Sequence, residues 1–153
     1  MALELTSRAR CGVRAMFQLA CHWGDGPVPL RTIADEQDLS LAYLEQIIRD
    51  LRLGGLVDSS RGCHGGYCLS REPVQIAVGD VIRCLEGPVT LAACADPSPD
   101  FEECVRGSFC VSRLLWTKVS QQIEEAFDSV SLEDLRAASQ RQLDEARKVF
   151  SIE

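Results

Sequence analysis

The fold is decided by residues 30–53, which read LRTIADEQDLSLAYLEQIIRDLRL. Apolar residues recur at helical spacing in two segments, 30–37 and 41–53, so each is predicted to form an amphipathic helix. Ser40 is a favourable N-cap for the second helix, and Gly54-Gly55 supplies its left-handed stop. Two helices joined by a three-residue turn predict a helix-turn-helix.

The segments on either side of this pair extend the pattern. A further helix is expected at 6–23, and short strands at 56–59 and 67–70 are separated by the glycine-rich tip 61–66. A basic hairpin directly after a helix-turn-helix is typical of a wing, although an ordinary surface hairpin is the alternative. The sequence therefore predicts a winged helix-turn-helix domain over residues 1–75.

The middle of the chain combines a short helix, expected at 78–85, with a loop at 89–109 that is rich in Pro, Asp and Glu. Together they form a segment over residues 76–109. A structureless loop of about twenty residues is uncommon in a small domain and is usually functional or disordered.

A long helix is expected from Cys110 to Val130. With no further domain to cover it, its apolar stripe predicts packing against a second copy of the helix, while packing on its own domain is the alternative. A capping box at 131–134 opens a final helix to about residue 149, so 110–153 is the expected dimerisation segment. The fold class is mostly α, a winged helix-turn-helix with a long C-terminal dimerisation helix. The apolar stripe of the long helix at 110–130 consists of Leu115, Val119, Ile123, Phe127 and Val130.

Charge is distributed unevenly along the 153 residues, whose net charge is −7. Up to Arg71 the chain has eight arginines and eight acidic residues, whereas the remainder has eight basic and fifteen acidic residues. An arginine-rich, neutral first half permits a basic face for nucleic acid. Three early arginines interrupt any signal peptide, and no apolar run is long enough to span a bilayer, so a cytoplasmic protein without a membrane partner is expected.

Eight cysteines are many for an intracellular chain, where such groups more often indicate metal, iron–sulfur or redox chemistry than disulfides. Cys21, Cys68 and Cys84 lie within apolar patterns and are expected to be core residues. The loop and the start of the long helix contribute Cys94, Cys104 and Cys110.

Several short motifs occur together in this sequence and are spread over nearly the whole chain. They are Val13-Arg14-Ala15, Ile33-Ala34, Tyr43-Leu44-Glu45-Gln46, Gly55-Leu56-Val57, Arg61-Gly62 with Gly65-Gly66-Tyr67, Gly79-Asp80-Val81-Ile82, Leu85-Glu86-Gly87-Pro88 and Leu115-Trp116. With the cysteine loop, they resemble the IscR/NsrR-type family of bacterial iron–sulfur transcription regulators. The resemblance implies a DNA-binding homodimer that performs no catalysis.

The second helix of the helix-turn-helix is then the recognition helix, whose N-terminal part enters the major groove. Glu45 can accept from a cytosine amino group and Gln46 can bridge an adenine edge. Ser40 and Tyr43 can bond phosphate, and Arg49 can reach the DNA backbone. A merely solvated helix face is the alternative.

The wing tip offers Arg61 to a narrow, A·T-rich minor groove, where negative potential concentrates. His64, next to Gly65 in the same tip, either assists Arg61 in binding DNA or is an ordinary surface residue. A dimer with two recognition helices and two wings predicts a pseudo-palindromic operator in double-stranded DNA.

In the resembled family three loop cysteines hold an iron–sulfur cluster, which implies Cys94, Cys104 and Cys110 as ligands of a 2Fe–2S or 4Fe–4S cluster sensing iron, redox or nitric oxide status. Thiolates that converge from a loop suit such a cluster, although the interval between Cys94 and Cys104 is longer than is usual. The alternatives are a thiol–disulfide switch without a cluster, a zinc site or no bound group at these cysteines, and an iron–sulfur electron carrier.

The fourth ligand is not evident. Some relatives use a histidine three residues after the last cysteine, but that position is Arg113, which does not ligate. Others take a ligand from the first helix of the partner subunit, where Cys11 is the soft donor. The alternative for Cys11 is an ordinary core thiol.

Overall fold

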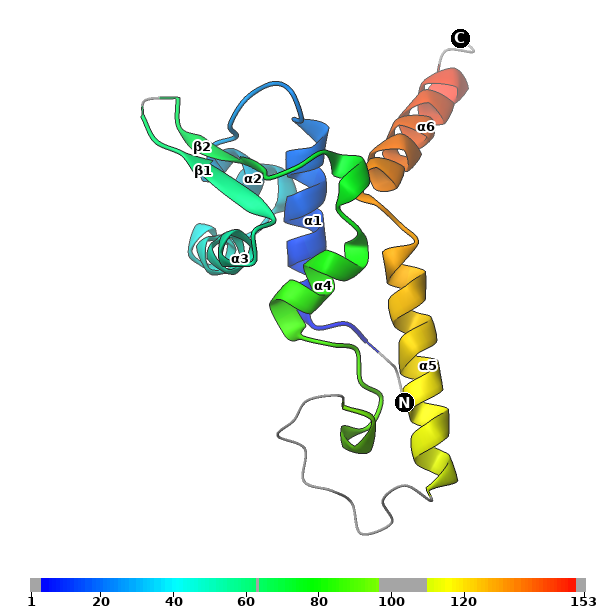
Figure 1. Ribbon diagram of the computed structural model, residues 1–153. Helices are drawn as coiled ribbons and strands as arrows, with labels where there is room; N and C mark the ends of the chain where they lie inside the picture. The colour runs from blue at the N-terminus through cyan, green and yellow to red at the C-terminus, as the bar shows by residue number, and fades with distance from the viewer. Residues whose placement is uncertain (1–3, 63, 97–109, 151–153) are drawn as a thin grey trace.

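The computed structural model of the protein describes residues 4–62, 64–96 and 110–150. Three helices and a two-stranded hairpin gather on one side of the molecule, and a long helix leads away from them (Figure 1). Within the described ranges no helix is both long and apolar enough to cross a lipid bilayer. The mostly helical, winged fold expected from the sequence is confirmed.

The first three helices are α1 (Ser7–Cys21), α2 (Leu30–Gln37) and α3 (Leu41–Leu53). The bounds of α2 and α3 coincide with those expected from the apolar periodicity. The Ser40 side chain caps α3 as predicted, because its Oγ accepts the Tyr43 N–H at 3.3 Å. The helix-turn-helix is therefore fixed by local signals.

The wing consists of β1 (Val57–Ser60) and β2 (Gly66–Leu69), which pair in antiparallel fashion. The expected strands differ from these by one residue at each end. At the start of β1 the reason is that the Leu56 N–H still donates to the carbonyl of Leu51, at 2.9 Å. Leu56 thus closes the end of α3, and the strand begins only after it.

The base of the wing is joined to the loop that follows α1. The Val28 N–H donates to the Tyr67 carbonyl at 2.8 Å, and the Tyr67 N–H donates back to Val28 at 2.9 Å. Gly66 lies so close to this loop that a Cβ atom would overlap the backbone of Val28 and Pro29. Glycine is therefore required at position 66 by close approach of two backbones.

One hydrophobic core unites these elements and includes residues from both halves of the chain. Most of its members come from α1, α2 and α3, as the helical periodicity predicts. Its largest fully buried side chains are Met16, Leu19, Ile33, Leu44, Ile47, Ile48, Leu51, Val57, Ile76, Val81 and Leu132.

The described residues of the second half include three α-helices, the first of which has a short 3₁₀ turn on each side. These are η1 (Pro73–Gln75), α4 (Val78–Glu86), η2 (Ala93–Ala95), α5 (Val111–Asp128) and α6 (Leu132–Phe150). The capping box that opens α6 is confirmed, since the Ser131 N–H donates to the Asp134 carboxylate at 2.8 Å and the Asp134 N–H donates to the Ser131 hydroxyl at 3.1 Å.

The chain returns to the core between α5 and α6. Leu132 is fully buried there, and its N–H donates to the Ile76 carbonyl at 2.9 Å. The Val78 N–H donates in turn to the Val130 carbonyl at 2.8 Å. The first turn of α6 thus shares the core of the winged helix-turn-helix, while the division of the chain at residues 75 and 109 stays a prediction.

The apolar stripe of α5 is only partly covered by the rest of the chain. Val119, Ile123 and Phe127 are half-buried, whereas Leu115 is 51% exposed and Leu114 is 68% exposed. The C-terminal part of α5 packs on its own domain, beside α4 (Figure 1). The N-terminal part leaves large apolar side chains in solvent.

Candidate DNA interface and cysteine site

A groove runs between the recognition helix α3 and the wing. Glu45, Gln46 and Arg49 were predicted to contact DNA, and all three are exposed along it. The full lining is Ala42, Glu45, Gln46, Arg49, Arg52, Ser59 and Tyr67. The structure therefore brings one face of α3 and the face of the hairpin beside it into a single surface.

The two residues predicted to bond phosphate stand at the start of α3. Ser40 is exposed, and its hydroxyl keeps a proton to donate even while its oxygen accepts the backbone N–H in the cap. Tyr43 is half-buried and packs against the core, so its ring helps to hold α3 in place.

Sequence reasoning missed Arg52, which lines the same groove. Its guanidinium lies 3.5 Å from the Ser59 hydroxyl of β1, so it connects the helix to the wing. Helical spacing could have found it, because Arg52 follows Arg49 by three residues and Glu45 by seven on one helix face.

The wing tip presents the three residues predicted there. Arg61 and His64 are exposed, while Gly65 is half-buried and closes the tip by donating its N–H to the Gly62 carbonyl at 3.0 Å. A Cβ at Gly65 would lie 2.6 Å from the Ser60 carbonyl, so this glycine is needed for the turn itself. Cys63 lies outside the described residues.

Four arginines of the first half differ in their ion pairing. Arg8 pairs with Asp50 of α3, and Arg71 pairs with Asp80 at 3.3 Å, so both hold the domain together. Among the described residues, Arg49 and Arg61 have no ion-pair partner. Their positive charge remains available to a polyanion, which is what phosphate contact requires.

Two of the three predicted cluster ligands are described. Cys94 lies in η2, and Cys110 is the N-cap residue of α5. The η2 turn packs against α5, the helix that Cys110 caps.

Cys104 lies outside the described residues, within 97–109. In the ranges that the structure does describe, no three His, Cys, Asp or Glu side chains gather closely enough to hold a metal ion. The donor chemistry of Cys94 and Cys110 nevertheless fits a soft metal, since both are sulfur ligands.

The remaining cysteines belong to the packing of the domain or to its surface. Cys11 and Cys84 are half-buried against the core, and burial raises the pKa of Cys84 and of Cys68. Thiols with a raised pKa are poor nucleophiles and ligands at neutral pH. The expectation of a core position is wrong for Cys21, the last residue of α1, which is exposed, and Cys68 is half-buried on β2 but does not belong to the residues packed on the core.

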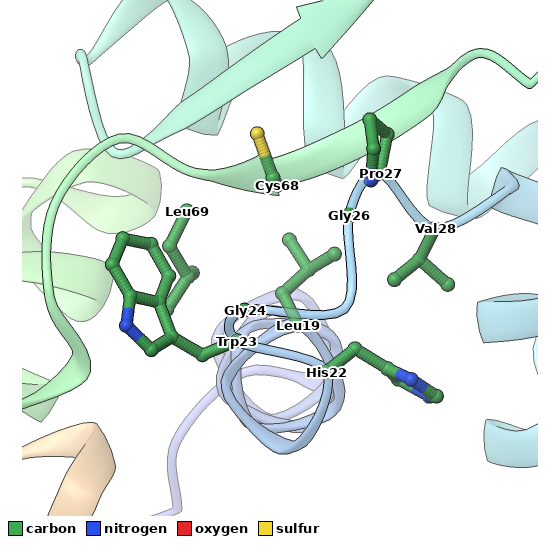
Figure 2. A pocket seen from close by; sticks show the side chains of 9 residues that line it. All are labelled: Leu19, His22, Trp23, Gly24, Gly26, Pro27, Val28, Cys68 and Leu69. Atoms are coloured by element: carbon green, nitrogen blue, oxygen red, sulfur yellow. The ribbon is translucent and has the colours of Figure 1, made fainter.

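A second hollow lies at the base of the wing, away from the groove. It is lined by Leu19, His22, Trp23, Gly24, Gly26, Pro27, Val28, Cys68 and Leu69. Trp23 and Leu69 lie side by side in it, whereas His22 extends in another direction (Figure 2). Its mostly apolar lining belongs to the packing of the wing on the end of α1.

A helix-turn-helix, a wing and an exposed polar face on the capped second helix define a winged-helix DNA-binding protein. The family model described as "Rrf2: Iron-dependent Transcriptional regulator" matches residues 5–138. The chain belongs to this family of transcription regulators, which includes IscR, NsrR and CymR. The protein is therefore a transcription regulator and not an enzyme, and the electron-carrier alternative loses its support.

The similar proteins include regulators named IscR and CymR. The chain is 41% identical to the HTH-type transcriptional regulator IscR of Aliivibrio salmonicida over 133 residues, which is 87% of this chain and 77% of that protein. The solved structure of T. potens IscR has a TM-score of 0.73 and 44% identity, covering 91% of this chain and 90% of that one. CymR of B. subtilis, titled a global cysteine regulator, has a TM-score of 0.72 and 39% identity, with 90% and 98% covered.

Proposed function

We propose that two copies of this chain bind a pseudo-palindromic operator in double-stranded DNA, in the cytoplasm. Each α3 lies in the major groove, with base contacts from Glu45 and Gln46. The phosphate backbone is contacted by Ser40, Tyr43 and Arg49. The observation that supports this proposal is the single groove in which the exposed face of α3 meets the wing.

The wing enters the neighbouring minor groove. Arg61 supplies the positive charge at the tip, and His64 lies next to it. Gly65 allows the tight tip that carries both side chains outward.

Cys94, Cys104 and Cys110 hold an iron–sulfur cluster of the 2Fe–2S or 4Fe–4S type. Support comes from the packing of η2, which contains Cys94, on α5, which Cys110 caps, and from the similarity to proteins named IscR. When bound, the cluster supplies a redox-active group that responds to iron, oxidants or nitric oxide.

A cluster-free regulator that senses by thiol oxidation is the second candidate. It is favoured by the comparable similarity to the protein titled a global cysteine regulator. In that case two of the same thiols form a disulfide, giving two electrons and two protons to an oxidant such as a peroxide. Both candidates use the same DNA interface.

The dimer forms through the N-terminal part of α5. Leu114, Leu115 and Val111 are exposed there, and adjacent large apolar side chains in solvent mark an interaction surface. This arrangement would bring one subunit's cysteine region near the partner's α1, which is the setting in which Cys11 could ligate. The half-buried packing of Cys11 against its own core supports the other role, that of a core thiol.

The deciding experiment is anaerobic reconstitution with iron and sulfide, followed by iron and sulfide analysis and by DNA binding of the loaded and metal-free forms. The cluster proposal expects about stoichiometric cluster in the wild type, its loss in Cys104→Ala, and different operator affinities for the two forms. Full iron and sulfide content in Cys104→Ala would overturn the ligand assignment. A wild type without iron, whose DNA affinity changes on peroxide treatment, would establish the thiol sensor instead.

A further inference from the structure

The segment after α4 is attached to α5 by two hydrogen bonds from its backbone. The Val89 N–H donates to Glu124 Oε1 at 3.0 Å, and the Leu91 N–H donates to Ser120 Oγ at 3.1 Å. Ser120 is 5% exposed and is the one buried polar side chain among the described residues. A buried hydroxyl in the middle of an amphipathic helix needs such a partner.

The spacing of the two bonds fixes a direction. Two residues of extended chain advance about 6.6 Å, and four residues of α-helix advance about 6 Å, so the two steps match. The order of contacts is reversed, because Val89 meets Glu124 and Leu91 meets Ser120. Residues 89–91 therefore run antiparallel to α5 and carry the chain toward its N-terminal end, where Cys110 stands.

We propose that Ser120 and Glu124 are positioning residues for the cysteine site. They set the register of residues 89–95 along α5, and through it the place of Cys94 relative to Cys110. The inference takes from the proposed function only the statement that these cysteines form the sensor. It adds that the position of the sensor depends on Ser120 and Glu124, which lie more than one helical turn from Cys110.

The composition of the segment explains why polar bonds carry this role. After Leu91 the chain reads Ala92-Ala93-Cys94-Ala95, which offers little apolar surface to bury. Small side chains hold a register weakly, because sliding by one residue changes few contacts. Two directed bonds to fixed positions of a helix resist such sliding.

The test compares variants that remove one acceptor with a variant that keeps it. Ser120→Ala and Glu124→Ala each remove an acceptor, whereas Glu124→Gln retains an oxygen at the same place. Glu125→Ala is the matched control, since Glu125 is exposed on the same helix turn and its side chain bonds none of the described residues.

The first measurement uses reduced, metal-free protein under nitrogen and follows the alkylation rate of each cysteine by mass spectrometry. We expect the Cys94 rate, relative to that of Cys84, to change at least threefold in both alanine variants and to stay at the wild-type value in Glu124→Gln and Glu125→Ala. A wild-type Cys94 rate in both alanine variants would overturn the proposal, whatever the protein binds.

The second measurement uses the reconstituted protein. Ser120→Ala and Glu124→Ala are expected to shift the visible circular dichroism of the cluster and to shorten its lifetime in air about tenfold, and Glu124→Gln is expected to restore both. If the wild type takes up no iron, the cluster proposal fails, while the alkylation rates still decide the positioning role. Unchanged spectra and lifetimes in both alanine variants would count against that role.

Discussion

Arg83 of α4 and Asp128 at the end of α5 form a two-pronged ion pair, with Nη2 2.7 Å from Oδ1 and Nη1 3.0 Å from Oδ2. Arg83 also donates to Asp80 at 3.1 Å, and Asp80 accepts from Arg71, which follows the wing. The hydrogen bond from Arg83 to Asp128 raises the pKa of the guanidinium, so it stays charged at any physiological pH. A continuous charged network thus joins the end of the wing to the end of α5.

Breaking this network should lower the free energy of unfolding slightly, and by less at high salt than at low salt. Both partners are more than a third exposed, so we expect a coupling free energy of about 0.5–1 kcal/mol between Arg83→Ala and Asp128→Asn at low salt. Urea denaturation of both single variants and the double variant, at low and high salt, measures it. Arg136→Ala, which breaks a pair within α6, is the control. A coupling that does not fall with added salt would contradict an ionic origin.

Leu132→Ala should destabilise the whole winged domain, because this side chain is fully buried in the shared core. A leucine truncated in such a core costs about 2.7–5 kcal/mol. Leu143→Ala, at a position 52% exposed on the same helix, should cost less than about 0.5 kcal/mol. Chemical denaturation followed by circular dichroism compares the two, and equal effects would show that α6 does not share the core.

Gly66→Ala should damage the wing while the helices remain folded. The added methyl group meets the backbone of Val28 and Pro29, which has no flexible end to move aside. We expect faster amide exchange at Val28 and Tyr67 and weaker DNA binding. Ser60→Ala, at an exposed strand position, is the control. Wild-type exchange rates in Gly66→Ala would mean that the wing accommodates the methyl group.

Arg61→Ala and Glu45→Ala should weaken DNA binding in different ways. Loss of Arg61 should reduce affinity for all sequences and lower the salt dependence by about one charge equivalent. Loss of Glu45 should relax selectivity at one operator position by roughly 1–3 kcal/mol. Titrations against an operator set at several salt concentrations distinguish these effects, and wild-type binding by both variants would refute the docking proposed here.

Leu115→Asp should separate the proposed dimer without unfolding the chain. Leu115 is half in solvent in the single chain, so a carboxylate costs little there, but it would be buried and unpaired between two α5 helices. Sedimentation should give a monomer with a wild-type circular dichroism spectrum. If the fourth ligand comes from the partner, this monomer should also lose its cluster quickly. A Leu115→Asp protein that stays dimeric would move the interface elsewhere.

Local signals in the sequence were sufficient for the DNA-binding half. Ser40 and the apolar periodicity gave the bounds of α3, and the glycine-rich tip gave the wing to within one residue. The strand β1 begins one residue later than expected because the Leu56 N–H bonds to the end of α3 and is not available to the sheet. The competition of helix and strand for this N–H depends on tertiary packing, which periodicity does not contain.

The features that were missed involve contacts between distant segments. The burial of Leu132 depends on where α5 ends relative to α1, and the bonds from Val89 and Leu91 require that residues 89–91 run along α5. The exposure of Cys21 also depends on distant segments, because apolar neighbours in the sequence do not show which side of a helix end is covered by the rest of the chain. The role proposed for Ser120 could not be read from its own position in the sequence.

The ion pair between Arg83 and Asp128 also limits how α5 can move relative to the winged domain. The ion pair fixes the C-terminal end of α5 to α4, and the 18 residues of the helix place its cysteine end about 27 Å away. A tilt of about 10° moves the far end by about 5 Å at this length. A displacement of the Cys110 end would therefore reach the Arg83–Asp128 pair as a small rotation of α5. In the proposed sensor, the ion pairs from Asp128 through Arg83 and Asp80 to Arg71 would then pass a rotation of α5, and not a translation, to the end of the wing.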